Sequence, residues 1–374
     1  MSTLKVDGIR SNSASSDAIT LASDGTCTAN ITNNLSNRNL IINGAMQVAQ
    51  RGTSSTVDGY GTIDRFRSNL LNCDENPTQS QSDVASGTTP YTLGFRKAFK
   101  FTNGNQTSGA GTADCVAILH RIEAQDIANS GWNYTDSNSK ITLSFWCKSS
   151  VAQNFYGFFR TQDGTLQLNA FETGSLTADT WTKVTKTITG DSNLQFDNNN
   201  DTGLDIEFTM FRGTDSTGTL TLNQWAAYNT NVRVPDMTST WYTTNDATFE
   251  LTGVQLEVGS VATDFEHRSF AQILQLCKRY YEQFVPKLYI FARFSSSAGA
   301  AYAQYHFNVE KRAAPTCSTS GTFESTSGYS GTPSFVYTRT DSTTLYAGSV
   351  AANGILYLFT TDSDNALIKF DSEL

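Results

Sequence analysis

The sequence predicts an all-β protein, and three observations support this prediction. Only 16% of the 374 residues are charged and 38% are hydrophobic, below the usual shares for a compact cytosolic enzyme. Ser, Thr, Asn and Gly, which suit strand surfaces and turns, fill the balance. Aromatic residues make up 11%, with 23 Phe and 15 Tyr, which is enough to build β cores and argues against disorder.

Residues 1–36 differ from the rest of the chain. They hold isolated apolar residues among Ser, Thr, Asp and Asn, too few to form a core of their own. Such a segment is either a flexible tail or a set of strands that order only against other copies. We favour the second interpretation and expect an assembly or attachment stem.

Residues 37–268 show the alternation of half-buried antiparallel strands. Apolar side chains take the odd positions in residues 141–147 (ITLSFWC) and the even positions in residues 204–211 (LDIEFTMF). In residues 248–258 (TFELTGVQLEV) the apolar parity switches across Thr252-Gly253, which predicts a β-bulge. Many short strands with turns between them predict a jelly-roll β-sandwich.

A helical period marks residues 269–285, with Ser269 placed as the N-cap and Pro286 after the end. The apolar stripe consists of Phe270, Ile273, Leu274, Cys277, Tyr280, Tyr281 and Phe284. This helix lies either on a sheet of its own chain or at a symmetry axis with its copies. Residues 286–374 return to strand-like texture and predict a smaller C-terminal β-sandwich domain.

Composition excludes several classes of protein. The net charge of −9 and the lack of a basic run argue against nucleic-acid binding. No apolar run is long enough for a signal peptide or a membrane span, so we expect no membrane insertion. The six dispersed cysteines form no C-x-x-C pair, which favours free thiols over disulfides and argues against a zinc site.

Neither a catalytic constellation nor a cofactor site is predicted. The three histidines lie far apart in the sequence, no G-x-S-x-G motif is present, and no carboxylate pair can be assigned. Residues 197–203 (DNNNDTG) offer oxygen ligands for Ca²⁺ but miss the EF-hand spacing. A turn stabilised by Asn and Asp side chains is favoured there, and a structural Ca²⁺ stays an alternative.

Several segments together resemble a family of bacteriophage tail-fibre and virion structural proteins. They are NRNLIINGAMQVAQRG with YGTIDRF, then HRIEAQDI, ITLSFWCKSS and WTKVTKTITGD, then LTGVQLEVGSVATDFEHRSFAQILQLCKRYYE and FNVEKRAAPT. The resemblance covers residues 37–315, and the leading KVDGI is similar to the start of fibre proteins of marine phages, including cyanophages. It implies a jelly-roll domain similar to carbohydrate-binding modules.

Domains of this kind usually bind sugar with exposed aromatic rings next to polar groups. Six rings in polar, loop-like surroundings are the candidates: Trp132, Tyr134, Trp225, Tyr228, Trp241 and Tyr242. Core packing stays an alternative for each of them. Trp146 and Trp181 lie within predicted strands and are interpreted as packing residues.

The resemblance leads to a functional expectation: a homotrimeric tail fibre of the virion, assembled in the host cytoplasm. Residues 1–36 would attach it to other virion proteins, such as a tail or portal-proximal adaptor, and the β domains would bind a host surface glycan. The alternative is a head-decoration or tail-scaffold protein with a purely architectural role. A glycan-cleaving tailspike is the third and least favoured hypothesis, because fibre enzymes that cut polysaccharide usually carry a long β-helix and this sequence shows no such repeat. We therefore expect no enzyme.

Overall fold

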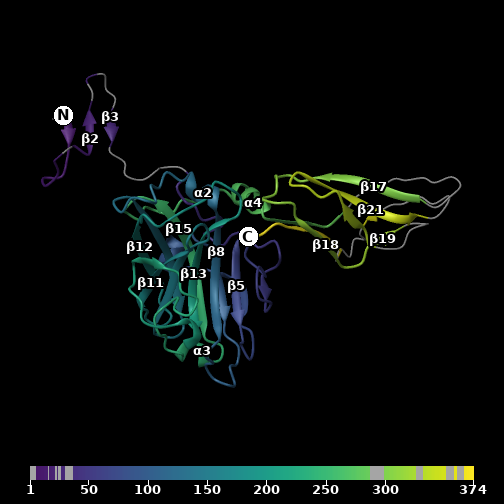
Figure 1. The fold of residues 1–374 in the computed structure, drawn as a ribbon, viewed down its shortest axis with the longest axis horizontal. Coiled ribbons are helices and arrows are strands. Elements are labelled where there is room, and N and C mark those ends of the chain that lie inside the picture. Colours follow the sequence, from purple (N-terminus) through teal and green to yellow (C-terminus); the bar gives the residue numbers. More distant parts are fainter. Residues whose placement is uncertain are drawn as a thin grey trace.

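The computed structural model describes residues 6–15, 17–21, 23, 27–29, 37–286, 299–325, 332–350, 358–359 and 366–374. Strands dominate it, as predicted, and the helices are short (Figure 1). The short helical segments are α1 (Thr89–Thr92), α2 (Ala124–Ala128), η1 (Thr214–Ser216), α3 (Thr240–Thr243) and α4 (Phe270–Lys278). Within these described ranges, no helix is long and apolar enough to cross a membrane.

Two six-stranded antiparallel sheets form the main body, a jelly-roll β-sandwich. The β13 sheet has the order β14 (Trp225–Ala227), β11 (Gln167–Ser175), β10 (Asn154–Thr161), β13 (Thr202–Arg212), β8 (Cys115–Glu123) and β5 (Phe66–Leu71). The β9 sheet has the order β12 (Thr182–Thr189), β9 (Lys140–Ser149), β15 (Thr248–Val258), β7 (Lys97–Thr102), β6 (Thr78–Asp83) and β4 (Ser54–Ser55). The chain crosses repeatedly between the sheets, for example from β8 to β9 and from β12 to β13.

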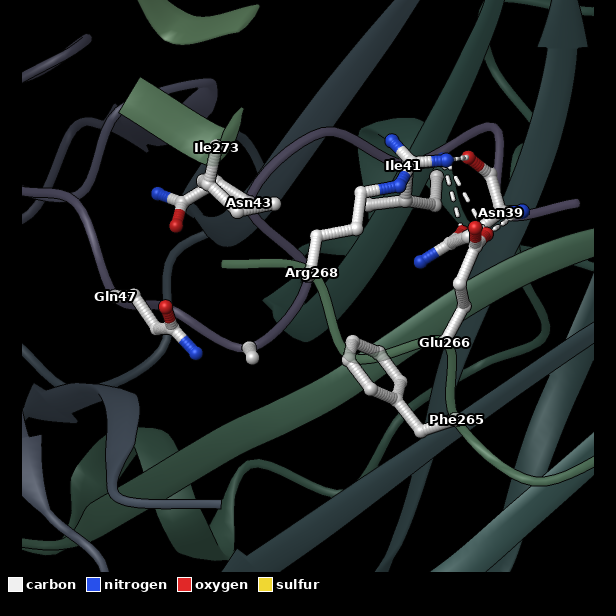
Figure 2. A pocket seen from close by; sticks show the side chains of 10 residues that line it. Asn39, Ile41, Asn43, Gln47, Phe265, Glu266, Arg268 and Ile273 are labelled. Atoms are coloured by element: carbon white, nitrogen blue, oxygen red, sulfur yellow. Dashed lines mark hydrogen bonds and ion pairs between the residues drawn. The ribbon is translucent and has the colours of Figure 1, made fainter. Parts of the chain in front are cut away.

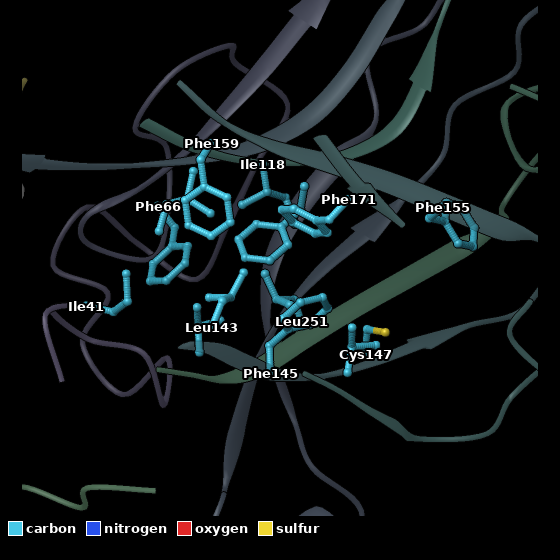
Figure 3. Packing of buried hydrophobic residues seen from close by; sticks show 14 of the residues in the cluster. Ile41, Phe66, Ile118, Leu143, Phe145, Cys147, Phe155, Phe159, Phe171 and Leu251 are labelled. Atoms are coloured by element: carbon cyan, nitrogen blue, oxygen red, sulfur yellow. The ribbon is translucent and has the colours of Figure 1, made fainter. Parts of the chain in front are cut away.

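The core lies between the two sheets and is rich in Phe, as the composition predicts (Figure 3). The ring of Phe145 from β9 meets that of Phe208 from β13 edge to face, with centroids 5.0 Å apart. Both belong to the apolar parity seen in the sequence, and both are almost fully buried. Each sheet therefore turns its other parity outward, away from this core.

The predicted β-bulge is confirmed. The pairing of β15 with β9 shifts register between Thr252 and Gln255, and Gly253 adopts a φ of +63°. That left-handed backbone favours glycine, which has no Cβ to clash with the chain. The bulge therefore lets one long strand bury both Phe249 and Leu251, which precede the glycine, and Val254 and Leu256, which follow it with the opposite parity.

The N-terminal strands β1 (Gly8–Ile9), β2 (Ile19–Leu21) and β3 (Cys27–Ala29) form a small antiparallel sheet that lies apart from the sandwich (Figure 1). Two of its apolar side chains are open to solvent, Ile9 at 52% exposed and Leu21 at 39% exposed, whereas Ile19 is half-buried. A sheet this small needs a packed apolar face to be stable. Strand structure is thus present here, while the assembly role expected for residues 1–36 stays a prediction.

Helix α4 begins where predicted, because Ser269 and Gln272 form a capping box. Ile273 and Cys277 pack on Val48, a loop residue of the same chain, so the helix contacts its own chain but not a sheet there. Packing of the helix against its copies stays a prediction. Of the rest of the stripe, Leu274 is half-buried against this cluster and Phe270, 56% exposed, packs against none of it.

The helix is shorter than expected, which corrects the range 269–285. It ends at Lys278, and Tyr280 is a buried turn residue. Tyr281 and Phe284 belong to a strand, β16 (Tyr281–Phe284), which pairs with β23 (Leu367–Asp371). The hydrogen bonds between β16 and β23 replace those of a helix. Because β23 lies far along the chain, the spacing of apolar residues in 269–285 does not indicate this pairing.

The described residues of the C-terminal part form three small sheets. They are β16-β23-β18 (Thr316–Ser320), then β17 (Gly299–His306)-β21 (Ser342–Val350)-β20 (Ser334–Val336), and then β19 (Glu324–Ser325) with β22 (Leu358–Phe359). Leu345 from β21 and Ile368 and Phe370 from β23 share one core, so the first two sheets pack on each other as a second, smaller sandwich. Of the cysteines, Cys73, Cys115, Cys147, Cys277 and Cys317 are free thiols, as predicted for them.

Ion pairs join the C-terminal strands to the main sandwich. The Glu373 carboxylate pairs with Arg65, which is 1% exposed, and lies 3.3 Å from Arg51. Glu123 accepts two hydrogen bonds of 2.8 Å from Arg279 and one of 2.6 Å from the hydroxyl of Tyr280. Although burial raises the pKa of Glu123, these three bonds and the Arg279 charge bring it below its usual value.

Candidate functional site

The aromatic residues predicted to bind sugar are mostly buried, which corrects that prediction. Trp241 and Tyr242 are 0% exposed, Trp132 is 3% exposed and Trp225 is 9% exposed. A ring must show a face to solvent to stack on a sugar. These four rings therefore serve the core.

The polar residues that flank these rings in the sequence belong to turns, and the turns cover the rings. The indole N–H of Trp241 donates to the carbonyl of Thr248 at 3.0 Å, and Tyr242 stacks on Phe211 with centroids 4.4 Å apart. Trp225 points into the sandwich and donates to the carbonyl of Thr189 at 2.9 Å. The hydroxyl of Tyr242 donates to the Asp114 carboxylate at 2.9 Å, so these three rings satisfy their polar atoms inside the protein and bury the rest.

Tyr134 and Tyr228 keep partial exposure but lie in different places. Tyr134 packs edge to face on Phe196, with centroids 4.9 Å apart. Tyr228 lies beside two guanidinium groups, 5.2 Å from Arg160 and 5.7 Å from Arg233. The six candidate residues are thus not gathered into one site.

A different aromatic pocket opens on the outer face of the β9 sheet. It has a volume of about 220 Å³. Its lining residues come from β9, β12, the β15 bulge and the segments 93–95 and 263–267: Leu93, Phe95, Ser144, Trp146, Lys183, Gly253, Thr263, Asp264, Phe265 and His267. Trp146 lies on the outer face between Lys183 and Thr252 of the neighbouring strands. It is half-buried and packs against a small cluster of Ala45, Val84, Phe95 and Ala98, as the packing interpretation predicts, while part of the ring lines the pocket.

A cluster of three rings forms one wall of this pocket, in which Phe95 is buried behind the half-buried Phe265 and the exposed His267. Phe95 meets Phe265 edge to face at a centroid distance of 4.9 Å, and His267 lies 4.9 Å from Phe265 and 5.3 Å from Phe95. Nε2 of His267 is 2.9 Å from the carbonyl oxygen of Leu93. This bond fixes the imidazole at the rim, so the wall is preformed.

The bulge in β15 makes room for this wall. A Cβ on Gly253 would lie 2.7 Å from Cζ of Phe95, well inside contact distance. The missing side chain therefore lets Phe95 cover the strand at the base of the pocket. The β-bulge that the parity switch predicted thus lines the pocket through Gly253.

We expect Gly253→Ala to lower the free energy of unfolding by more than the about 1–2 kcal/mol that a left-handed non-glycine residue costs. The excess comes from displacing Phe95. Gly87→Ala is the matched control, since Gly87 has a φ of +85° with open space around its Cβ position. Urea unfolding of both variants measures the difference, and equal losses would contradict the crowding at Phe95.

Hydrogen bonds behind Phe265 hold its segment against residues 37–47 (Figure 2). Glu266 accepts from the backbone N–H groups of Asn37 and Asn39 at 2.7 and 2.8 Å and from Arg268 at 3.2 Å. Burial raises the pKa of Glu266, but these donors and the Arg268 charge bring it below its usual value. The carboxylate is thus ionised and anchors the segment that carries Phe265 and His267.

The rim of the pocket is polar. Lys183 and Asp264 are exposed, and Ser144 and Thr263 supply hydroxyls. An aromatic wall beside donors and acceptors suits a molecule with one apolar face and a hydroxyl edge, which describes a pyranose ring. The site can bind such a molecule without covalent chemistry.

A signal for Trp146 is present in the sequence. In residues 141–147 it occupies the polar parity, with Thr142 and Ser144, opposite Phe145 on the core parity. A large aromatic residue on the polar face of an alternating strand is an outward ring. The packing interpretation of Trp146 also holds, but its packing partners lie on this outer face and not in the main core.

The histidines lie in three separate places. His120 is 1% exposed, and its ring lies tilted beside Phe66 with centroids 4.8 Å apart. Burial, followed by the Arg65 charge, lowers the pKa of His120 far below the usual value. His267 belongs to the pocket and His306 to β17. Among the residues that the structure describes, no group of three or more His, Cys, Asp or Glu could hold a metal ion.

No protein-family model and no curated protein matches the chain. Among solved structures, the enzymatically active domain of bacteriophage CBA120 tailspike protein 4 matches with a TM-score of 0.31 and 9% identity. That match covers 59% of this chain and 21% of the tailspike chain.

Two further matches are to carbohydrate-binding modules. A CBM4 structure matches with a TM-score of 0.29 and 13% identity over 58% of this chain and 97% of that chain. The tandem CBM22 domains of Paenibacillus barcinonensis Xyn10C match with a TM-score of 0.28 and 9% identity over 90% of each chain. Similarity at this level carries no argument, so the fold rests on the strand order given above.

Proposed function

We propose that the chain is a glycan-binding protein and that the pocket around Trp146 and Phe265 is its binding site. The observation that carries the proposal is Trp146 on the outer face of the β9 sheet, which lines one pocket together with Phe265, His267 and the exposed polar groups of Lys183 and Asp264. One ring of a saccharide would stack on the aromatic surface while its hydroxyls bond to the rim. Binding involves no catalytic step.

The proposal extends to a virion, where the chain would serve as a tail fibre. The sequence resemblance to phage fibre proteins supports this role, and the exposed apolar residues of the N-terminal sheet support a stem that packs against copies of itself. A homotrimer would present three pockets and strengthen weak single-site binding by multivalency. The stem would also attach the trimer to other virion proteins.

A glycan array probed with the full-length protein, followed by retention on host cell envelopes, tests the binding function. Retention on at least one saccharide is expected, with no release of reducing ends from it. Failure to bind any saccharide and any envelope would refute glycan binding. Release of reducing ends would favour a tailspike enzyme.

Two measurements test the assembly. Sedimentation at micromolar concentration is expected to give a trimer, and a monomer would contradict the stem proposal. Immunogold labelling of particles is expected to mark the tail, whereas labelling of the head would favour the alternative of a head-decoration protein.

A further inference from the structure

The rim of the pocket carries a positive charge that no carboxylate neutralises. Lys183 is exposed and lies directly opposite Trp146 in the pairing of β12 with β9. Within the described part of the chain, its ammonium group forms no ion pair or hydrogen bond. Other lysines of the sandwich do pair, for example Lys148 with Glu250 at 2.9 Å and Lys97 with Asp83 at 2.6 Å.

Asp264 lines the same pocket, and among the described residues no ion pair joins it to Lys183. Its segment is held by its backbone, since its carbonyl accepts from Arg38 at 2.6 Å, and the Asp264 side chain remains exposed. The pocket thus offers a cation and a carboxylate at separate points around an aromatic wall. A carboxylate suits sugar hydroxyls as donors, and the cation suits an anionic group.

From this arrangement we infer that the pocket selects an acidic sugar, in which a carboxylate or a sulfate ester meets Lys183. The inference rests on the proposed glycan-binding function and names the class of its ligand. The apolar face of the sugar ring lies on Trp146 and Phe265, its hydroxyls reach Asp264, and its negative group reaches the ammonium of Lys183. The net charge of −9 would repel such a ligand elsewhere, so the local cation decides the contact.

Ligand-observed NMR with small matched probes tests the inference on the full-length protein. The probes are glucuronate, its methyl ester, glucose 6-sulfate and glucose, so that ring and charge vary separately. Glucuronate or glucose 6-sulfate is expected to bind about tenfold more tightly than glucose and the ester, the scale of one charge-assisted hydrogen bond. The preference should weaken as salt is raised.

Variants separate the charge from the pocket. Lys183→Gln should remove the about tenfold preference and leave glucose binding unchanged, while Lys183→Arg should keep it. Lys140→Gln is the matched control, because Lys140 is exposed on the outward parity of β9, the strand that pairs with the strand of Lys183, but lies outside the pocket.

The outcomes distinguish this inference from the function on which it rests. Equal binding of charged and neutral probes, or a preference that survives Lys183→Gln, overturns the acidic-sugar inference while glycan binding stands. Binding of none of the probes counts against the inference, and the glycan array then decides the function separately. Carboxylate preferred over sulfate, or the reverse, identifies the negative group.

Discussion

Replacing Glu373 with alanine is expected to lower the free energy of unfolding by about 3–5 kcal/mol, the usual cost of removing one partner of a buried ion pair. Glu373 is 5% exposed and pairs with Arg65, whose guanidinium is 1% exposed and lies 3.4 Å from the ring centre of Tyr280. Without the carboxylate, Arg65 stays charged and buried with its main counter-ion gone. Urea unfolding followed by tryptophan fluorescence measures the loss.

The control for this variant is an exposed ion pair. Asp83→Ala removes the partner of Lys97, and the Asp83 side chain is 82% exposed, so the expected loss is about 1 kcal/mol or less. Similar small losses for Glu373→Ala and Asp83→Ala would show that Glu373 does not hold the C-terminal strands against the sandwich.

Trp146→Ala is expected to weaken glycan binding by about 30-fold or more, which corresponds to the about 2 kcal/mol that a buried aromatic anchor contributes. The loss arises because the sugar face no longer has a ring to stack on. Stability should change little by comparison, since Trp146 is half-buried and outside the main core. Titration with the saccharide retained on the array measures the change in affinity.

Two controls make this result specific to the ring in the pocket. Trp146→Phe keeps an aromatic face and should retain most of the affinity. Tyr337→Ala removes a ring that is 78% exposed on the C-terminal part, and it should leave affinity unchanged. Equal affinity of Trp146→Ala and the unaltered protein would place the site elsewhere.

Much of the fold follows from local pattern. Alternation in residues 141–147 predicted β9, and the parity switch at Gly253 predicted the bulge in β15. Ser269 as the N-cap predicted the start of α4, and the structure adds Gln272 as its partner in a capping box. These features depend on neighbours within a few residues, so a single sequence contains them.

The errors come from contacts between distant segments. The end of α4 depends on β23, whose strand partner Asp371 is ninety positions from Tyr281. The burial of Trp241 and Tyr242 depends on Thr248 and Phe211 and not on the polar residues beside them. Polar neighbours in the sequence predict a turn. The solvent exposure of an aromatic ring in that turn depends on which distant segments pack over it.

NMR of the tryptophan indoles tests the central claim most directly. The chain has five tryptophans, and Trp132, Trp225 and Trp241 lie in the core, whereas Trp146 lines the outer pocket. On addition of a retained saccharide, the indole signal of Trp146 should shift and the signals of the three core tryptophans should stay in place. Shifts of Trp132, Trp225 or Trp241 with Trp146 unmoved would contradict the account.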